Sequence, residues 1–395
     1  MTHLKVLAEE IGPRPSGSKA EDRAAQYIHS NLQSTKRIES AIHPFAAAAD
    51  TDWTLAILFG FYYLFGIVAF FDPFLAGIGI LIAGFLIFRE LSYRPLLSKL
   101  FPCQSRNVIG RLSPTSDPKI EIVLSAHLDS GRTAKSRITS SPKADRYSFF
   151  IMCIFLISGM GLLGLAGIYS LFWINNGSTD LLIALSFPTT IYAGVTSLFL
   201  FAKLKFHKHS VGANDNASGI AVVLETARIL SQRKASSASI VFLFSGSEES
   251  GLRGILEFLS RHCRDGIPRV FLNIDSCGRG KLAMVTAEGW LIPQSSDPKL
   301  RERGYMCAKD LGIDLEEAGR GKAIVSDMAA VLRQGYPGLT ITALKEENST
   351  LFSHTPEDTM DRISVGTMID AVNLLACMTR SSANVSEWAE TSPAA

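Results

Sequence analysis

Four long stretches without a charged residue limit what this chain can fold into. They are residues 54–71, 74–88, 148–174 and 181–202. A helix needs roughly 20 apolar residues to cross a bilayer, and three of the four stretches approach or exceed that length. The composition agrees, because 47% of the residues are hydrophobic and only 19% are charged. We therefore predict four transmembrane helices. The alternative, four buried helices of a soluble protein, is disfavoured because uncharged runs of this length are rare outside membranes.

The four stretches pair into two helical hairpins with a clear charge asymmetry. Asp72-Pro73 separates the first pair, and the sequence 175–178 separates the second. The hairpin turns carry only Asp72 and Asp180 as charged residues, whereas lysines and arginines flank the open ends. These flanking residues are Arg89, Arg94, Lys99, Lys143, Arg146, Lys203, Lys205 and Lys208. Because positively charged loops stay in the cytoplasm, we predict an integral, multi-pass membrane protein whose polar part faces the cytoplasm.

The cysteines and the N-terminus fit the same assignment. The six cysteines are scattered without a CxxC pair, so neither a zinc knuckle nor a disulfide framework is predicted, and unpaired thiols suit the reducing cytoplasm. The N-terminal sequence MTHLKVLAEEIGPRP has acids and a proline where a signal peptide needs an apolar run, so we do not expect a cleaved secretion signal. The net charge of +2 is too small to indicate a nucleic-acid partner.

Outside the hydrophobic stretches, strand-like and helix-like segments alternate. The predicted strands are 119–125, 239–244, 270–274 and 339–344, and the predicted helices are 21–32, 219–230, 252–260 and 365–378. This alternation predicts an α/β fold with a largely parallel mixed sheet flanked by helices. The α/β domain would comprise residues 1–50, 93–146 and 205–395, interrupted by transmembrane hairpins at 51–92 and 147–204.

Side chains that bind metals follow several of these strands, where ligands of parallel sheets gather. They are His127 and Asp129 after KIEIVLSA, Glu248 and Glu249 after SIVFLFSGS, Asp275 after VFLNI, His354 in the loop after LTITAL, and Asp215 before a helix in VGANDNASG. Zinc takes imidazole nitrogen and carboxylate oxygen as ligands. Two histidines and three carboxylates can hold two zinc ions if one carboxylate bridges them, and such a pair can hold a shared hydroxide and polarise a carbonyl.

Taken together, these segments resemble metallopeptidase family 28, the bacterial leucyl aminopeptidase type. The matching pieces are IGPRPSGSKAEDRAAQYI, SAHLDSG, VGANDNASGIAVVLETAR, FSGSEESGLRG, NIDSCGRG and FSHTPEDT, in the family's order. The resemblance implies two zinc ions as cofactors. His127 and Asp275 would bind one ion, Glu249 and His354 would bind the other, and Asp215 would bridge both.

The resemblance also implies two residues that act beside the metals. Glu248 would be the general base, which takes a proton from metal-held water and passes it to the leaving amine, and it needs a raised pKa to do so. Asp129 matches the carboxylate behind His127 and is expected to accept the proton of that imidazole's other nitrogen. The implied protein is a membrane-anchored dizinc aminopeptidase that hydrolyses N-terminal peptide bonds through a metal-bound hydroxide, with peptides as substrates and the lipid bilayer as a partner.

Other functions remain open on the same residues. The scaffold also resembles glutaminyl cyclases and carboxypeptidases, which the ligands alone do not separate. A catalytically dead binding or receptor protein is a further alternative. Retention of all five ligands and the base favours an enzyme, and His127 with Asp275 completes a second ion, which favours hydrolysis over single-zinc cyclisation.

Overall fold

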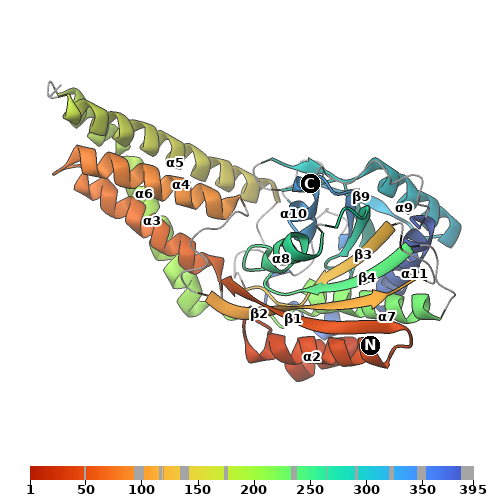
Figure 1. Ribbon diagram of the computed structural model, residues 1–395. Helices are drawn as coiled ribbons and strands as arrows, with labels where there is room; N and C mark the ends of the chain where they lie inside the picture. The colour runs from red at the N-terminus through yellow and green to blue at the C-terminus, as the bar shows by residue number, and fades with distance from the viewer. Residues whose placement is uncertain are drawn as a thin grey trace. The chain divides into compact units, whose positions relative to one another are not determined.

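Figure 1 shows the computed structural model of the chain. It describes residues 1–48, 50–92, 102–114, 118, 120–133, 142–172, 177–232, 238–263, 265–289, 292–319, 324–344 and 353–383. Some residues on which the sequence predictions depend lie outside the described part. These are Arg94, Lys99, Lys119 and the turn residues Asn175 and Asn176, together with the side chains of Lys143 and Arg146.

The chain divides into two compact units that alternate along the sequence. Unit 1 comprises Met1–Ala49, Pro102–Pro142 and Lys208–Ala395, and unit 2 comprises Asp50–Phe101 and Lys143–His207. Unit 2 therefore consists of two insertions into the chain that forms unit 1.

Unit 1 is built on an eight-stranded sheet with the order β1-β2-β4-β3-β5-β10-β6-β9. The strands are β1 (Ile38–Ala48), β2 (Pro102–Leu112), β3 (Ile120–His127), β4 (Ala238–Ser245), β5 (Arg269–Ile274), β6 (Lys281–Val285), β9 (Glu316–Ala318) and β10 (Gly338–Leu344), while β7 (Ala287–Glu288) and β8 (Gln294–Ser295) form a separate pair. The central strands β4, β3, β5 and β10 run parallel. Strand β1 is antiparallel to β2, β2 to β4, and β6 to β10. The predicted α/β class with a largely parallel mixed sheet is confirmed.

Helices cover both faces of this sheet. The helical segments of unit 1 are α1 (Thr2–Leu4), η1 (Lys5–Ile11), α2 (Lys19–Ser34), η3 (Ala213–Ser218), α7 (Gly219–Ser231), α8 (Arg253–His262), α9 (Pro298–Leu311), α10 (Asp327–Arg333), η4 (Met360–Arg362) and α11 (Val365–Ser381). Helices α2, α7 and α11 lie on one face, where Ile28, Val223 and Leu374 join the main hydrophobic core. Helices α8 and α10 lie on the other face (Figure 1).

The sequence predicted the central elements better than the edges. The four predicted strands correspond to β3, β4, β5 and β10, and the four predicted helices correspond to α2, α7, α8 and α11. Strands β1, β2, β6 and β9 and helices α9 and α10 were not predicted. Strand β1 contains Pro44, which cannot donate to a ladder hydrogen bond and is tolerated because β1 lies at the edge of the sheet.

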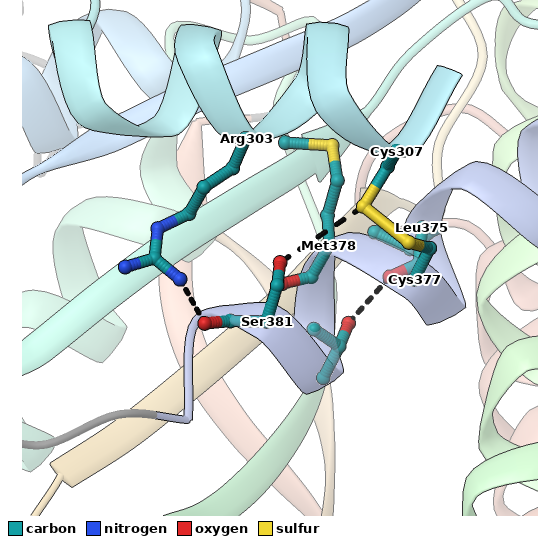
Figure 2. Close-up of a disulfide and its surroundings, with 7 residues drawn as sticks. Arg303, Cys307, Leu375, Cys377, Met378 and Ser381 are labelled. Atoms are coloured by element: carbon teal, nitrogen blue, oxygen red, sulfur yellow. Dashed lines mark hydrogen bonds between the residues drawn. A yellow bond between two sulfur atoms is a disulfide. The ribbon is translucent and has the colours of Figure 1, made fainter. Parts of the chain in front are cut away.

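A disulfide between Cys307 and Cys377 corrects the prediction that the cysteines are unpaired. It joins α9 to α11, as Figure 2 shows, with a Cα–Cα separation of 5.9 Å. The other four cysteines carry free thiols. The two partners are 70 positions apart in the sequence and meet only because α9 and α11 pack together, so spacing gave no indication of the pair.

Unit 2 contains four helices that are each long and apolar enough to cross a membrane. They are α3 (Thr51–Val68), α4 (Pro73–Leu91), α5 (Pro142–Leu171) and α6 (Ser178–Phe206). The interruption at Asp72-Pro73 starts α4, because the Asp72 carboxylate accepts a hydrogen bond from the Leu75 amide at 3.0 Å and Pro73 occupies the first turn. Large apolar side chains such as Ile154 and Leu198 lie exposed on the outside of this unit.

Candidate metal centre

The predicted ligands gather at the carboxyl ends of the parallel strands. His127 is the last residue of β3, Glu249 lies in the loop after β4, and Asp275 follows β5 directly. His354 lies between β10 and η4, and Asp215 lies in η3 before α7. Because β4 and β5 flank β3 on opposite sides, the chain reverses its winding direction here, which is where such sheets form crevices for ligands.

Three of the five side chains form a first group of possible metal donors. His127 Nε2 lies 3.1 Å from Asp215 Oδ1 and 3.8 Å from Asp275 Oδ1. His127 and Asp215 are both buried, whereas Asp275 is partly exposed. A histidine facing two carboxylates across these distances is a donor set that suits zinc.

Asp215 also belongs to a second group. Its other oxygen, Oδ2, lies 3.4 Å from His354 Nε2, and that nitrogen lies 2.9 Å from Glu249 Oε1. The possible donor atoms within each group lie within 4.8 Å of one another. The two oxygens of Asp215 are thus turned toward different groups, as a bridging carboxylate requires.

The residues fit a pair of zinc ions on both geometry and charge. Donors that lie about 2.0–2.2 Å from a tetrahedral zinc ion are separated from one another by roughly 3.3–3.6 Å. The distances within the two groups, from 2.9 to 3.8 Å, span that range. Three carboxylates held this close repel one another, and two divalent cations would offset that repulsion.

Glu248 belongs to neither group, but its carboxylate interacts electrostatically with His127, Glu249 and Asp275. Burial, the largest cause, raises the pKa of Glu248 well above its ordinary value, and the charge of Glu249 raises it further while His127 opposes the shift. A carboxylate that holds a proton more readily than usual suits a general base.

Asp129 makes different contacts from those expected. His127 Nδ1 lies 3.1 Å from the backbone oxygen of Asp129 and 3.6 Å from its carboxylate Oδ1. The carboxylate instead accepts hydrogen bonds from the amides of Glu248 at 2.9 Å and Glu249 at 3.1 Å. Asp129 therefore orients the imidazole through its backbone carbonyl and the two glutamates through its side chain.

The N-terminal segment supports the same loops through residues whose role was not predicted from the sequence. Ser16 Oγ donates to Asp129 Oδ2 at 2.9 Å. Glu21 accepts from Ser105 Oγ at 2.8 Å and from the Ser247 amide at 3.2 Å, directly before Glu248. Burial raises the pKa of Glu21 to about 8. Ser16 and Glu21 both lie in the IGPRPSGSKAED motif, which is the sequence feature that could have predicted their role.

Arg14, from the same motif, is a fully buried cation. Its guanidinium donates to backbone carbonyl oxygens of Leu7, Gly12, Leu128, Val211 and Gly212. These acceptors come from the N-terminal segment, the end of β3 and the start of the Asp215 loop, so one side chain connects three segments of the centre.

The loop around Asp215 is tied to the Asp275 segment by the asparagines on either side of it. Asn214 Oδ1 accepts from the Gly278 amide at 2.7 Å, and Asn216 Nδ2 donates to the Ile274 carbonyl at 2.9 Å. The peptide bond between Asp215 and Asn216 is cis. These contacts explain why an asparagine stands on each side of Asp215: Asn214 and Asn216 hold Asp215 against β5 and the segment that follows it.

Several residues beside the ligands adopt positive φ angles without being glycine. Ser247 and Ser276 both have φ of 53°, and His354 has φ of 59°. Such conformations cost free energy and persist where the surrounding structure imposes them, and they cluster at functional sites. Ser247 directly precedes Glu248, Ser276 directly follows Asp275, and His354 is itself a predicted ligand.

A further buried acid lies under the loop after β4. Asp327, the first residue of α10, accepts a hydrogen bond from Ser245 Oγ, and burial raises its pKa to about 7. It belongs to neither donor group.

Comparison with protein families places this site in a known context. The model of peptidase family M28 matches residues 197–379, a range that includes Asp215, Glu249, Asp275 and His354. The match begins after His127, which the structure nevertheless brings to the same site.

Individual relatives agree with the family match. Endoplasmic reticulum metallopeptidase 1 of Mus musculus is 29% identical over 177 residues, which are 43% of this chain and 19% of that protein. Leucine aminopeptidase 1 of Ajellomyces dermatitidis is 29% identical over 173 residues, which are 40% of this chain and 43% of that protein. The chain thus matches less than half of the length of each of these two relatives.

Solved structures show the same fold at low sequence identity. A zinc aminopeptidase from Bacillus subtilis is 17% identical, with a TM-score of 0.56 over 96% of this chain and 93% of that chain. A glutaminyl cyclase from Porphyromonas gingivalis is 14% identical, with a TM-score of 0.56 over 96% of both chains. Residues 197–379 thus resemble peptidase family M28, and the chain shares its fold with these solved structures.

Proposed function

We propose that this chain is a membrane-anchored dizinc aminopeptidase that hydrolyses N-terminal peptide bonds. The observation that carries the proposal is the position of Asp215, whose two oxygens face two separate donor groups. The M28 domain and the leucine aminopeptidase relatives support peptide substrates.

The residues of the chain would divide the work of hydrolysis. His127 and Asp275 would hold one zinc ion, Glu249 and His354 the other, and Asp215 both. When bound, the two ions would polarise the scissile carbonyl and acidify the attacking water.

Glu248 would take the proton of that water and deliver it to the leaving nitrogen. Asp129 would keep Glu248 and Glu249 in a fixed relation, because its carboxylate binds both of their backbone amides. The negative charge of the two glutamates would also attract the protonated amino terminus of a peptide.

A substrate panel with the purified, zinc-loaded full chain tests this proposal. The panel contains peptides with free amino termini, the same peptides with acetylated amino termini, carboxypeptidase substrates and peptides that begin with glutamine. We expect release of the N-terminal residue from free peptides, loss of that release on acetylation, and inhibition by the chelator phenanthroline. Release from the carboxyl terminus, or activity that phenanthroline leaves unchanged, would contradict the proposal.

The panel also separates the aminopeptidase from a glutaminyl cyclase and from an inactive binding protein. The shared fold with glutaminyl cyclases supports cyclisation of N-terminal glutamine as the second candidate. Ammonia release from glutamine peptides without peptide-bond cleavage would identify a cyclase. A folded chain that binds close to zero zinc ions and acts on no member of the panel would identify a binding protein on a peptidase scaffold.

We further propose that unit 2 crosses the bilayer as two hairpins with unit 1 on the cytoplasmic side. Four long apolar helices support the anchoring, and the basic residues at the ends of α4 and α6 support the orientation. Lys203 Nζ lies 2.6 Å from Asp52 Oδ2, so the end of α6 and the start of α3 lie at the same end of unit 2. Protease digestion of intact cells tests the orientation. We expect unit 1 to be protected, and cleavage of unit 1 from outside the cells would overturn the proposal.

A further inference from the structure

Asp358 is a buried carboxylate beside the metal centre that belongs to neither donor group. Asp358 is only 1% exposed, and it lies four positions after His354 in the FSHTPEDT motif. A carboxylate removed from water needs hydrogen-bond donors to stay ionised. The partners of Asp358 therefore show what it holds in place.

Those partners are two successive amides of the loop that carries the bridging ligand. The Asn214 amide donates to Asp358 Oδ1 at 2.6 Å, and the Asp215 amide donates to Asp358 Oδ2 at 3.2 Å. Both oxygens of one side chain thus fix the backbone at Asp215, the residue whose own carboxylate faces both donor groups.

The same residue is fixed to the segment of another ligand. The Asp358 amide donates to the carbonyl oxygen of Thr355 at 3.2 Å, which closes a tight turn directly after His354. Asp358 therefore spans the distance between the Asp215 loop and the His354 turn. The connection of Asp215 to Asp275 uses other residues, Asn214 and Asn216.

We propose that Asp358 is a positioning residue for the zinc pair, which sets the bridging carboxylate of Asp215 at the correct distance from His354. The inference rests on the metal-binding part of the proposed function. A carboxylate is suited to the task because it only accepts hydrogen bonds, so both of its oxygens can bind amides at once. An amide side chain offers one acceptor and would turn a donor toward the second amide.

The test is zinc binding by the full chain carrying Asp358→Asn. Loss of a residue that orients metal ligands typically lowers metal affinity by about 10–100-fold, and we expect a loss in this range for the variant. Competition with a chelator of known affinity measures it without reference to catalysis. Thermal unfolding of the zinc-free protein is measured in parallel, because a purely structural role would lower the stability of the zinc-free chain and leave the affinity of the folded protein unchanged.

Asp361→Asn is the matched control. Asp361 lies three positions further on, carries the same charge and is exposed. We expect this variant to bind zinc like the parent chain. Equal weakening in both variants would assign the effect to the lost negative charge and overturn the positioning role.

The outcomes separate this inference from the proposed function. A parent chain that binds no zinc refutes the metal centre itself. A parent chain and an Asp358→Asn variant that bind two zinc ions with equal affinity refute only the role of Asp358. If Asp358→Asn does not fold, Asp358→Glu takes its place: it keeps the charge and both acceptors but extends the side chain by one methylene. We expect weaker zinc binding from that displacement, and parental affinity would overturn the inference.

Discussion

Glu248 belongs to neither group of possible metal donors, so its replacement should separate metal binding from proton transfer. Glu248→Gln keeps the size of the side chain and removes the base. Because general bases typically contribute about 10²–10⁴-fold, we expect turnover to fall by that factor while zinc content stays unchanged. Glu225→Gln, on the outer side of α7, is the control for loss of a surface carboxylate. A Glu248→Gln enzyme as fast as the parent would remove Glu248 from the mechanism.

Asp129 belongs to neither donor group and contacts the loop that carries Glu248 and Glu249. Asp129→Asn leaves one acceptor oxygen for the two amides of Glu248 and Glu249, so one of them loses its hydrogen bond. We expect a loss of about 10–100-fold in zinc affinity or turnover. Measuring both quantities shows whether the ligand Glu249 or the base Glu248 is displaced. A variant unchanged in both would show that Ser16 and the surrounding loop suffice to hold the two glutamates.

Glu288 should make the stability of the folded domain depend on pH. Burial raises its pKa from 4.5 to about 7, and its carboxylate accepts hydrogen bonds from the amide and hydroxyl of Ser326. The folded state therefore binds more protons than the unfolded state between these two values, and stability should fall as the pH rises from 4.5 to about 7. This shift in the pKa of Glu288 corresponds to a change of about 3 kcal/mol in the free energy of unfolding.

Glu288→Gln should remove this contribution, since glutamine keeps an acceptor for Ser326 and does not ionise. Unfolding midpoints of parent and variant between pH 4.5 and 7 measure the difference in slope. Parallel pH profiles would show that Glu288 does not titrate in this range.

At the scale of elements, the sequence predicted what periodicity and composition encode. The buried central strands β3, β4, β5 and β10 read as apolar runs, and the metal-type residues follow them directly, so both were visible in the sequence. The antiparallel strands β1 and β2 were missed, because polar and charged residues such as His43 and Arg106 interrupt their apolar residues. The support of the centre by Arg14, Glu21 and Asp358 was missed because each acts through hydrogen bonds to loops that are distant in the sequence.

The packing of α4 against α5 depends on glycine. A Cβ atom at Gly77 would lie 3.0 Å from the carbonyl oxygen of Leu163 and 3.4 Å from the Cα of Gly167. Small residues allow transmembrane helices to approach this closely. At Gly161 of α5, an added Cβ would meet nothing within 4 Å among the described residues, which makes it a matched control.

Gly77→Leu should therefore destabilise unit 2 relative to Gly161→Leu, by about 1–3 kcal/mol as for other overpacked sites. Both variants gain the same helix propensity, so the comparison isolates packing. Unfolding of the detergent-solubilised chain by sodium dodecyl sulfate measures the difference. Equal stability of the two variants would contradict the close approach of α4 and α5.

For the whole molecule, the compartment of unit 1 determines the state of the Cys307–Cys377 pair. The cytosol keeps thiols reduced, whereas disulfides persist in oxidising compartments. With unit 1 in the cytoplasm, as the flanking charges predict, we expect the cytosol to reduce this disulfide, so that alkylation in rapidly quenched cells labels all six cysteines. Air-oxidised purified protein should have only four free cysteines. Four labelled cysteines in cells would instead place unit 1 in an oxidising compartment and overturn the predicted orientation.

In the proposed mechanism, two zinc ions and Glu248 together release the N-terminal residue of a peptide. The most direct measurement is the rate of N-terminal residue release by the full chain as zinc is titrated into the metal-free protein. We predict that release from free-amine peptides rises to a plateau at two zinc ions per chain and is absent from acetylated peptides. A zinc-saturated, folded chain that releases no N-terminal residue, or one that cleaves acetylated peptides equally well, would contradict the claim.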